Sequence, residues 1–307
     1  MTYTVNSIKI FPVMKRPYLF CVILIWALSF PAGACRAANE PREVPEWLER
    51  INLGLDAGTG QKPTVYFETV QPLYQDLDKQ DTFFIQPRYS LLENDSAYNL
   101  GLGYRKLLND NSILLGANSF FDYEDDNKHY RIGFGTESFI NQLEMRTNYY
   151  IGLSPRRIDK RANNSVTYEK AVDGLDGEIG LPLPYVNWIK VYAAGYWYNY
   201  EKFKNKEGWW MRNEITPFKN TTINLVVWDD NKGDKEFRVD ARIAVPFEFY
   251  YGKRRGKLCN IGFSSSPYPD KADHSDKTLR RVERQYKIEV EKWSETGNTI
   301  VEVKRGN

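Results

Sequence analysis

Short runs of alternating apolar and polar residues recur through the middle of the chain, and this period of two constrains the fold more than any other feature. Clusters of Gly, Asn, Asp and Pro, which favour turns, separate the runs. The mean hydropathy of −0.58 excludes a protein built from several apolar membrane-spanning helices. The pattern predicts about twelve strands, over residues 51–58, 63–71, 82–90, 97–107, 113–123, 129–139, 142–153, 173–182, 188–199, 207–217, 220–229 and 235–249.

The predicted strands have one apolar and one polar face. In the last of them, the apolar face collects Phe237, Val239, Ala241 and Ile243, and Arg238, Asp240 and Arg242 alternate with these residues. A soluble sandwich or barrel also alternates, and it stays open as an alternative. Two features favour a transmembrane β-barrel: many strands have about ten residues, and aromatic residues gather near strand ends. We therefore predict an all-β chain that forms a closed antiparallel barrel.

The N-terminal residues 1–38 resemble a secretory signal peptide. Lys15 and Arg16 precede the apolar run Tyr18–Phe30, which is followed by small residues. The run is short for a membrane span, so a retained anchor is the weaker alternative. We predict that the chain is exported to the outer membrane of a Gram-negative-type bacterium.

The predicted organisation has four parts. A signal peptide (1–38) is followed by a periplasmic entry segment (39–50), the barrel (51–263) and a linker with a charged segment (264–307) that we expect in the barrel lumen. Residues 278–293 are heavily charged and fit either a helix or a strand. Cys259 is the one cysteine clearly in the mature body, which supports neither a disulfide framework nor a zinc site.

Charged residues gather on the polar face of the strands. An arginine near the bilayer midplane costs ~2–4 kcal/mol on the lipid side, so these groups must face the lumen. Their balanced signs predict mutual salt bridges and a polar filler rather than a strongly ion-selective pore. The predicted lumen-lining residues are Arg88, Arg105, Asp122, Arg131, Glu137, Glu144, Arg146, Asp176, Glu178, Arg238, Asp240 and Arg242.

The sequence gives little support for catalysis. His129 and His274 are the only histidines, and neither lies in a motif with metal-ligand or nucleophile spacing. Asp125 and Asp126 lie close to His129, but acidic turn residues beside a histidine are typical of a solvated hairpin. We predict no catalytic residue, no cofactor and no metal. A net charge of +2 is also no footprint of nucleic-acid binding.

An ordered series of motifs resembles the β-domain of the inverse autotransporters, the intimin/invasin family. The resemblance covers roughly residues 45–290, and the order and spacing of the motifs are more specific than any single one. The series is PEWLER, YFETVQPLYQ, FFIQPRYS, NLGLGYRKL, LLGANSFFDYE, HYRIGFGTE, NYYIGLS, VDGLDGEIGLPLPY and RRVERQYKIEV.

This resemblance implies a twelve-stranded barrel with both barrel termini in the periplasm. A linker then enters the lumen and leads an extracellular passenger, typically of Ig-like adhesive domains, out of the cell. Asp122, Arg131 and Glu137 match polar positions of the family pattern and would lie near the linker. The aromatic stretch 245–251 would act as the assembly signal. The implied partners are outer-membrane lipid and lipopolysaccharide, the barrel-assembly machinery and periplasmic chaperones.

The sequence shows no passenger and no peptidoglycan-binding module, so adhesion does not carry over. We expect a barrel-only member, a truncated adhesin, or a barrel whose passenger is a separate chain. The predicted function is a non-enzymatic outer-membrane translocator or anchor. The alternatives are a small-solute porin, an outer-membrane hydrolase that uses His129, and surface attachment through the basic loop 154–171.

Overall fold

The computed structural model describes residues 45–59, 61–92, 95–162, 164–244, 260–268 and 272–303. The predicted signal peptide and the aromatic stretch 245–251 lie outside the described residues. No helix in the described part of the chain is long and apolar enough to cross a membrane.

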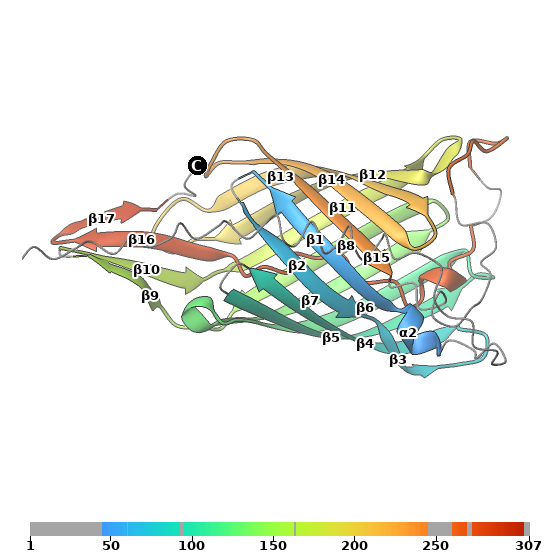
Figure 1. Cartoon of the computed structure of the whole chain (residues 1–307), viewed down its shortest axis with the longest axis horizontal. Helices are drawn as coiled ribbons and strands as arrows, with labels where there is room; N and C mark the ends of the chain where they lie inside the picture. The colour runs from blue at the N-terminus through green and yellow to red at the C-terminus, as the bar shows by residue number, and fades with distance from the viewer. Residues whose placement is uncertain are drawn as a thin grey trace, which may run out of the picture. The chain divides into compact units, whose positions relative to one another are not determined.

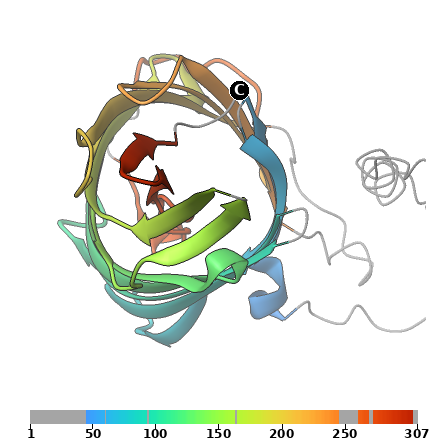
Figure 2. The ribbon, with the colours of Figure 1, turned by 90° about the vertical axis from the view of Figure 1, so that its left-hand side faces the viewer.

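Twelve antiparallel strands form a closed barrel, which confirms the predicted fold (Figure 2). Consecutive strands pair with each other, and the first strand pairs with the last, where Leu53 lies opposite Ile243. The strands are β1 (Ile51–Gly58), β2 (Gln61–Thr69) with its short continuation β3 (Gln71–Gln75), β4 (Asp81–Leu92), β5 (Asp95–Leu108), β6 (Ile113–Glu124), β7 (His129–Ile140), β8 (Leu143–Gly152), β11 (Asp173–Leu183), β12 (Val186–Asn199), β13 (Lys206–Phe218), β14 (Thr221–Asp230) and β15 (Glu236–Ala244).

The two faces of the wall differ as the alternation predicts. In β5, Leu100 and Leu102 are 51% and 54% exposed on the outer face. Asn99 and Arg105, on the other parity of the same strand, are buried inside. Charged groups on the outer parity would face lipid at a cost of ~2–4 kcal/mol per arginine near the midplane, so only this orientation suits a membrane.

The barrel has two distinct ends (Figure 1). At one end, which we call the turn end, the strands are joined by the short connections 109–112, 141–142, 184–185 and 219–220. The short helix α2 (Glu46–Glu49) leads into β1 at this end. His274, directly before the 3-10 helix η3 (Ser275–Lys277), donates its backbone amide to the carbonyl of Asn111 in the connection 109–112.

The opposite end, which we call the hairpin end, carries a second sheet of four strands. Its order is β17-β16-β10-β9, with bounds β9 (Arg157–Ala162), β10 (Ser165–Ala171), β16 (Val290–Thr296) and β17 (Thr299–Glu302). The short 3-10 helix η1 (Asp126–Lys128) also lies here. The basic loop 154–171 is therefore largely a β-hairpin of β9 and β10, and β10 also pairs with β16.

Residues 278–293 do not form the helix that their charge pattern allowed. Residues 278–289 belong to no helix or strand, and β16 begins at Val290. Side chains of the barrel wall, rather than a helical backbone, satisfy many polar groups of this segment, as described below.

Glycines on the inner face make room for aromatic rings of the neighbouring strands. A Cβ atom at Gly101 would lie 2.3 Å from the ring of Phe120, and one at Gly103 would lie 2.2 Å from the ring of Phe84. Only glycine allows such close approach. The rings thus lie flat against the wall and leave space for the chain that enters the barrel.

Candidate functional site

The structure places eleven of the twelve predicted lining residues in buried positions on the inner face of the strands. Arg238, the exception, is half-buried, and its Nε lies 3.7 Å from Oδ1 of Asp56. The buried residues pair across neighbouring strands. Nη2 of Arg105 lies 2.7 Å from Oε2 of Glu137, and Nε of Arg131 lies 2.9 Å from Oδ2 of Asp122. Such pairing lets charges lie in the interior of the barrel.

Several buried lumen groups were missed from the sequence. The alternation in strands 188–199, 207–217 and 220–229 is less regular, so the sequence did not assign their faces. Glu68 lies on the same face of its strand as Tyr66, and Glu214 lies on the same face as Arg212. The alternation of each strand was therefore the signal that could have placed these residues in the lumen. The missed groups are Tyr66, Glu68, Gln86, Tyr192, Arg212 and Glu214, together with the half-buried Lys190.

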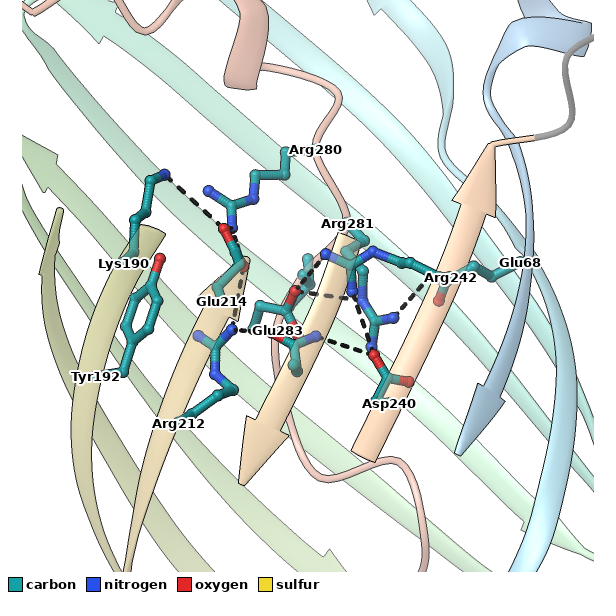
Figure 3. Close-up of polar contacts among 12 residues, drawn as sticks. Glu68, Lys190, Tyr192, Arg212, Glu214, Asp240, Arg242, Arg280, Arg281 and Glu283 are labelled. Carbon is teal, nitrogen blue, oxygen red and sulfur yellow. Dashed lines mark hydrogen bonds and ion pairs between the residues drawn. The ribbon is translucent and has the colours of Figure 1, made fainter. Parts of the chain in front are cut away.

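Three arginines of residues 278–289 bind carboxylates from separate parts of the wall. Figure 3 shows two of them, Arg280 and Arg281, with their partners Glu214 and Glu68. Both carboxylate oxygens of Glu214 in β13 accept hydrogen bonds from Nη2 of Arg280 at 2.6 Å. Nη1 of Arg281 donates to Oε1 of Glu68 in β2 at 2.8 Å.

The third arginine binds a third part of the wall. The guanidinium of Arg284 donates to both carboxylate oxygens of Asp122 in β6, at 2.7 and 2.8 Å. An acidic residue of the segment pairs in the reverse sense: Nη2 of Arg242 in β15 donates to Oε1 of Glu283 at 3.3 Å. Basic residues of the segment therefore pair with acidic residues of the wall, and an acidic residue of the segment pairs with a basic residue of the wall.

The backbone of the segment also bonds to wall side chains. The Val282 amide donates to Oε1 of Gln86, and the Gln285 amide donates to the hydroxyl of Tyr150, both at 2.9 Å. Nη2 of Arg131 donates to the Gln285 carbonyl at 2.7 Å. Since buried backbone groups are costly when unpaired, these bonds compensate for the absence of strand pairing.

A small apolar contact lies among these polar groups. Val282 is fully buried against Val70, Phe84 and Phe120 of the wall. The ring of Tyr286 packs edge-on against Phe120, with centroids 6.2 Å apart. These contacts remove the apolar side chains of the segment from water, which stabilises it in place.

Strand pairing and ion pairs hold the segment at the hairpin end. Residues 290–295 of β16 pair with residues 166–171 of β10. The carboxylate of Glu291 is fully buried and accepts hydrogen bonds from the backbone amides of Glu201, Lys202 and Phe203, at 2.8 to 3.0 Å. Nζ of Lys206 lies 2.9 Å from Oε1 of Glu289.

His129 lies between a serine and a glutamate at the hairpin end. Its Nδ1 is 2.8 Å from Oγ of Ser154, and its Nε2 is 3.5 Å from Oε2 of Glu169. These residue types occur in serine hydrolases, but here all three are buried, and Nζ of Lys292 also lies 2.7 Å from Glu169. Among the described residues, His129 contacts Ser154 and Glu169 rather than its expected neighbours Asp125 and Asp126. We interpret the group as a structural link between β7 and β10.

The pKa of Glu169 reflects this buried environment. Burial alone would raise the pKa of the Glu169 carboxyl, but hydrogen bonds from His129, Lys292 and Asn127 outweigh burial and lower the pKa to about 2. The carboxylate is therefore ionised at neutral pH and pairs with Lys292 of β16.

A closed barrel with an apolar outer face and a charged inner face defines an outer-membrane β-barrel. The model of the family "Inverse autotransporter, beta-domain" matches residues 42–286. The chain belongs to this family, which confirms the resemblance drawn from the motifs and places the barrel in the Gram-negative outer membrane.

Two curated proteins of Escherichia coli K12 are similar to the chain. The inverse autotransporter adhesin YeeJ is 27% identical over 243 residues, which is 76% of this chain and 10% of YeeJ. A putative attaching and effacing protein homolog is 28% identical over 122 residues, 38% of this chain and 40% of that protein. The chain thus spans less than half the length of these relatives.

A solved structure from a study of the in-meso crystallization of membrane proteins has the same fold. The TM-score is 0.61 at 16% identity, and the match covers 79% of this chain and 99% of the solved one.

Proposed function

We propose that the barrel anchors the chain in the outer membrane and delivers its C-terminal segment through the lumen to the cell surface. One observation carries the proposal: residues 277–289 bind inward-facing side chains all around the barrel, and the next residues pair with a hairpin at one end of it. A chain held in this way connects the two sides of the membrane.

The connections between strands support the direction of the path. Outer-membrane barrels have short periplasmic turns and longer extracellular loops. The turn end is then periplasmic and the hairpin end extracellular. The chain leaves β15 at the turn end and, at residues 290–302, lies at the hairpin end, so the segment runs outward.

The proposed barrel is not an enzyme and not an open porin. Ser154, His129 and Glu169 are buried, so a substrate has no access to the serine hydroxyl. The segment 277–289 occupies the space that a solute would need, since Val282 and Tyr286 pack against Phe120 of the wall. YeeJ is named an adhesin; for this chain, a surface passenger held by the segment is part of the proposal.

Cysteine labelling in intact cells tests the proposed direction. Asn298 is exposed in the turn between β16 and β17, and Lys219 is exposed at the turn end. In a Cys259→Ala background, Asn298→Cys should react with a membrane-impermeant maleimide on whole cells. The matched variant Lys219→Cys should react only after the outer membrane is permeabilised. Labelling of Lys219→Cys alone in intact cells would overturn the orientation.

A further inference from the structure

The three arginines of the segment are bound at three separated places of the wall. Arg280 binds β13, Arg281 binds β2 and Arg284 binds β6. These strands are not neighbours in the ring, so the contacts surround the segment. Figure 3 shows Arg280 and Arg281 directed towards carboxylates on different strands of the wall, Glu214 and Glu68.

The wall carboxylates have partners of their own besides the segment. One oxygen of Glu68 accepts from Arg88 of the wall at 3.2 Å, and its other oxygen accepts from Arg281. Asp122 binds Arg131 of the wall, and Glu214 binds Arg212. Each carboxylate therefore stays paired with an arginine of the wall when the segment is absent, which limits the free-energy cost of leaving the carboxylate buried in an empty lumen.

Only one register of the segment places a guanidinium at all three carboxylates. The arginines have the spacing i, i+1 and i+4, and Val282 and Glu283 lie between them. A slip by one residue would place Val282 or Arg280 at Glu68 and would place Glu283 or Gln285 at Asp122. Like charges or an uncharged amide would then replace the bidentate pair at Asp122.

We propose that the lumen is a binding site for an extended basic peptide, which it recognises by the spacing of three guanidinium groups, and that the peptide need not be covalently joined to the barrel. This inference rests on the proposed function and deepens it, because it names the chemistry that stops the outgoing chain at one register. It also means that a separate chain with the same spacing of arginines can occupy the barrel.

Peptide exchange into the nicked full-length protein tests this inference. A protease site inserted after Ser265, which is exposed in the described stretch 260–268, allows the folded protein to be cut in detergent micelles. The cut protein is then incubated with an excess of a fluorescent synthetic peptide of residues 272–303. Binding is followed by fluorescence anisotropy and by release of the original fragment.

Three control peptides separate guanidinium spacing from charge. One carries Arg280→Gln, Arg281→Gln and Arg284→Gln; a second carries lysine at the same positions and keeps the charge. A third exchanges Arg281 and Val282 and keeps the composition. The native peptide should bind at least ~10-fold more tightly than each control, since the bidentate pair of Arg284 with Asp122 depends on the planar fork of arginine.

Equal binding of the native and lysine peptides would overturn recognition by guanidinium groups, and equal binding of the exchanged peptide would overturn recognition by spacing. If no peptide enters after the original fragment has left, the claim of binding without covalent connection fails. The labelling of Asn298→Cys in whole cells reports on the proposed function independently, so the two failures are distinguishable.

Discussion

Arg284 and Asp122 face each other inside the barrel in a two-pronged ion pair, with N–O distances of 2.7 and 2.8 Å. Asp122 also accepts a hydrogen bond from Nε of Arg131 at 2.9 Å and one from Asn99 at 2.8 Å. One wall carboxylate thus joins the segment to two strands of the barrel. Since it serves two arginines, its loss should matter more than the loss of either arginine.

We expect Asp122→Asn to destabilise the protein more than Arg284→Gln. The first change leaves two buried guanidinium groups without their anion, and breaking a buried pair costs about 3–5 kcal/mol. The second change leaves Asp122 paired with Arg131. The free energy of unfolding, from denaturant titration in detergent micelles, checks the order. Equal effects, or a larger effect of Arg284→Gln, would contradict the role of Asp122 as the shared partner.

Gly101→Ala should destabilise the barrel, because the added methyl would lie 2.3 Å from the ring of Phe120. Overpacking of this kind costs about 1–3 kcal/mol. Gly177 is the matched control: it lies in a strand, and an added Cβ would be no closer than 3.7 Å to any neighbouring atom. The temperature at which the folded band disappears in heat-modifiable gel mobility should fall for Gly101→Ala and stay unchanged for Gly177→Ala.

Glu291→Ala should loosen β16 from the hairpin end, since three backbone amides at residues 201–203 lose their acceptor. Hydrogen exchange of the β16 amides should become faster, while exchange in β5 stays unchanged. Thr299→Ala, at an exposed position in β17, is the control. Unchanged protection of β16 in Glu291→Ala would show that the pairing with β10 alone holds the segment.

The contribution of Glu169 should depend on pH. Its pKa in the folded protein, about 2, lies below the ordinary value of 4.5, so the ionised carboxylate stabilises the fold above about pH 4.5. This stabilisation is lost as the pH falls towards 2. The melting temperature of Glu169→Gln should therefore lie below that of the wild type at pH 7, and the difference should vanish near pH 2.

The exposed residue Glu207 provides the control for this titration. Glu207→Gln should change the melting temperature little at either pH. A difference between wild type and Glu169→Gln that stays constant from pH 7 to pH 2 would contradict the assigned role of the Glu169 carboxylate.

The strands of the barrel were predictable because their signal is local. The alternation of Phe237 and Val239 with Arg238 and Asp240 already defines two faces, and most predicted strand bounds lie within two residues of the observed ones. The four-stranded sheet was not predictable in this way. β10 finds its partner in β16, more than a hundred residues later, and the basic sequence around Arg157 shows no apolar face.

Some lumen residues were likewise predictable from local alternation, and others were not. Arg105 and Asp122 could be placed by parity alone, and the structure has both buried inside. Glu68 and Glu214 are as important for the segment, and parity was the signal that could have placed them, since each shares the face of a buried neighbour, Tyr66 or Arg212. The arginines at 280, 281 and 284 form a charged run in the sequence. Only the positions of Glu214, Glu68 and Asp122 give each of them a partner.

The central claim is that residues 277–289 cross the interior of the barrel in one register. Photo-crosslinking in living cells tests it most directly, with p-benzoylphenylalanine in place of Tyr286, whose hydroxyl accepts a hydrogen bond from Gln86 and whose ring packs against Phe120. Mass spectrometry of the irradiated protein should find crosslinks within the same chain, to peptides of β4 and β6. Crosslinks to other proteins, or to strands on the opposite part of the wall, would contradict the claim.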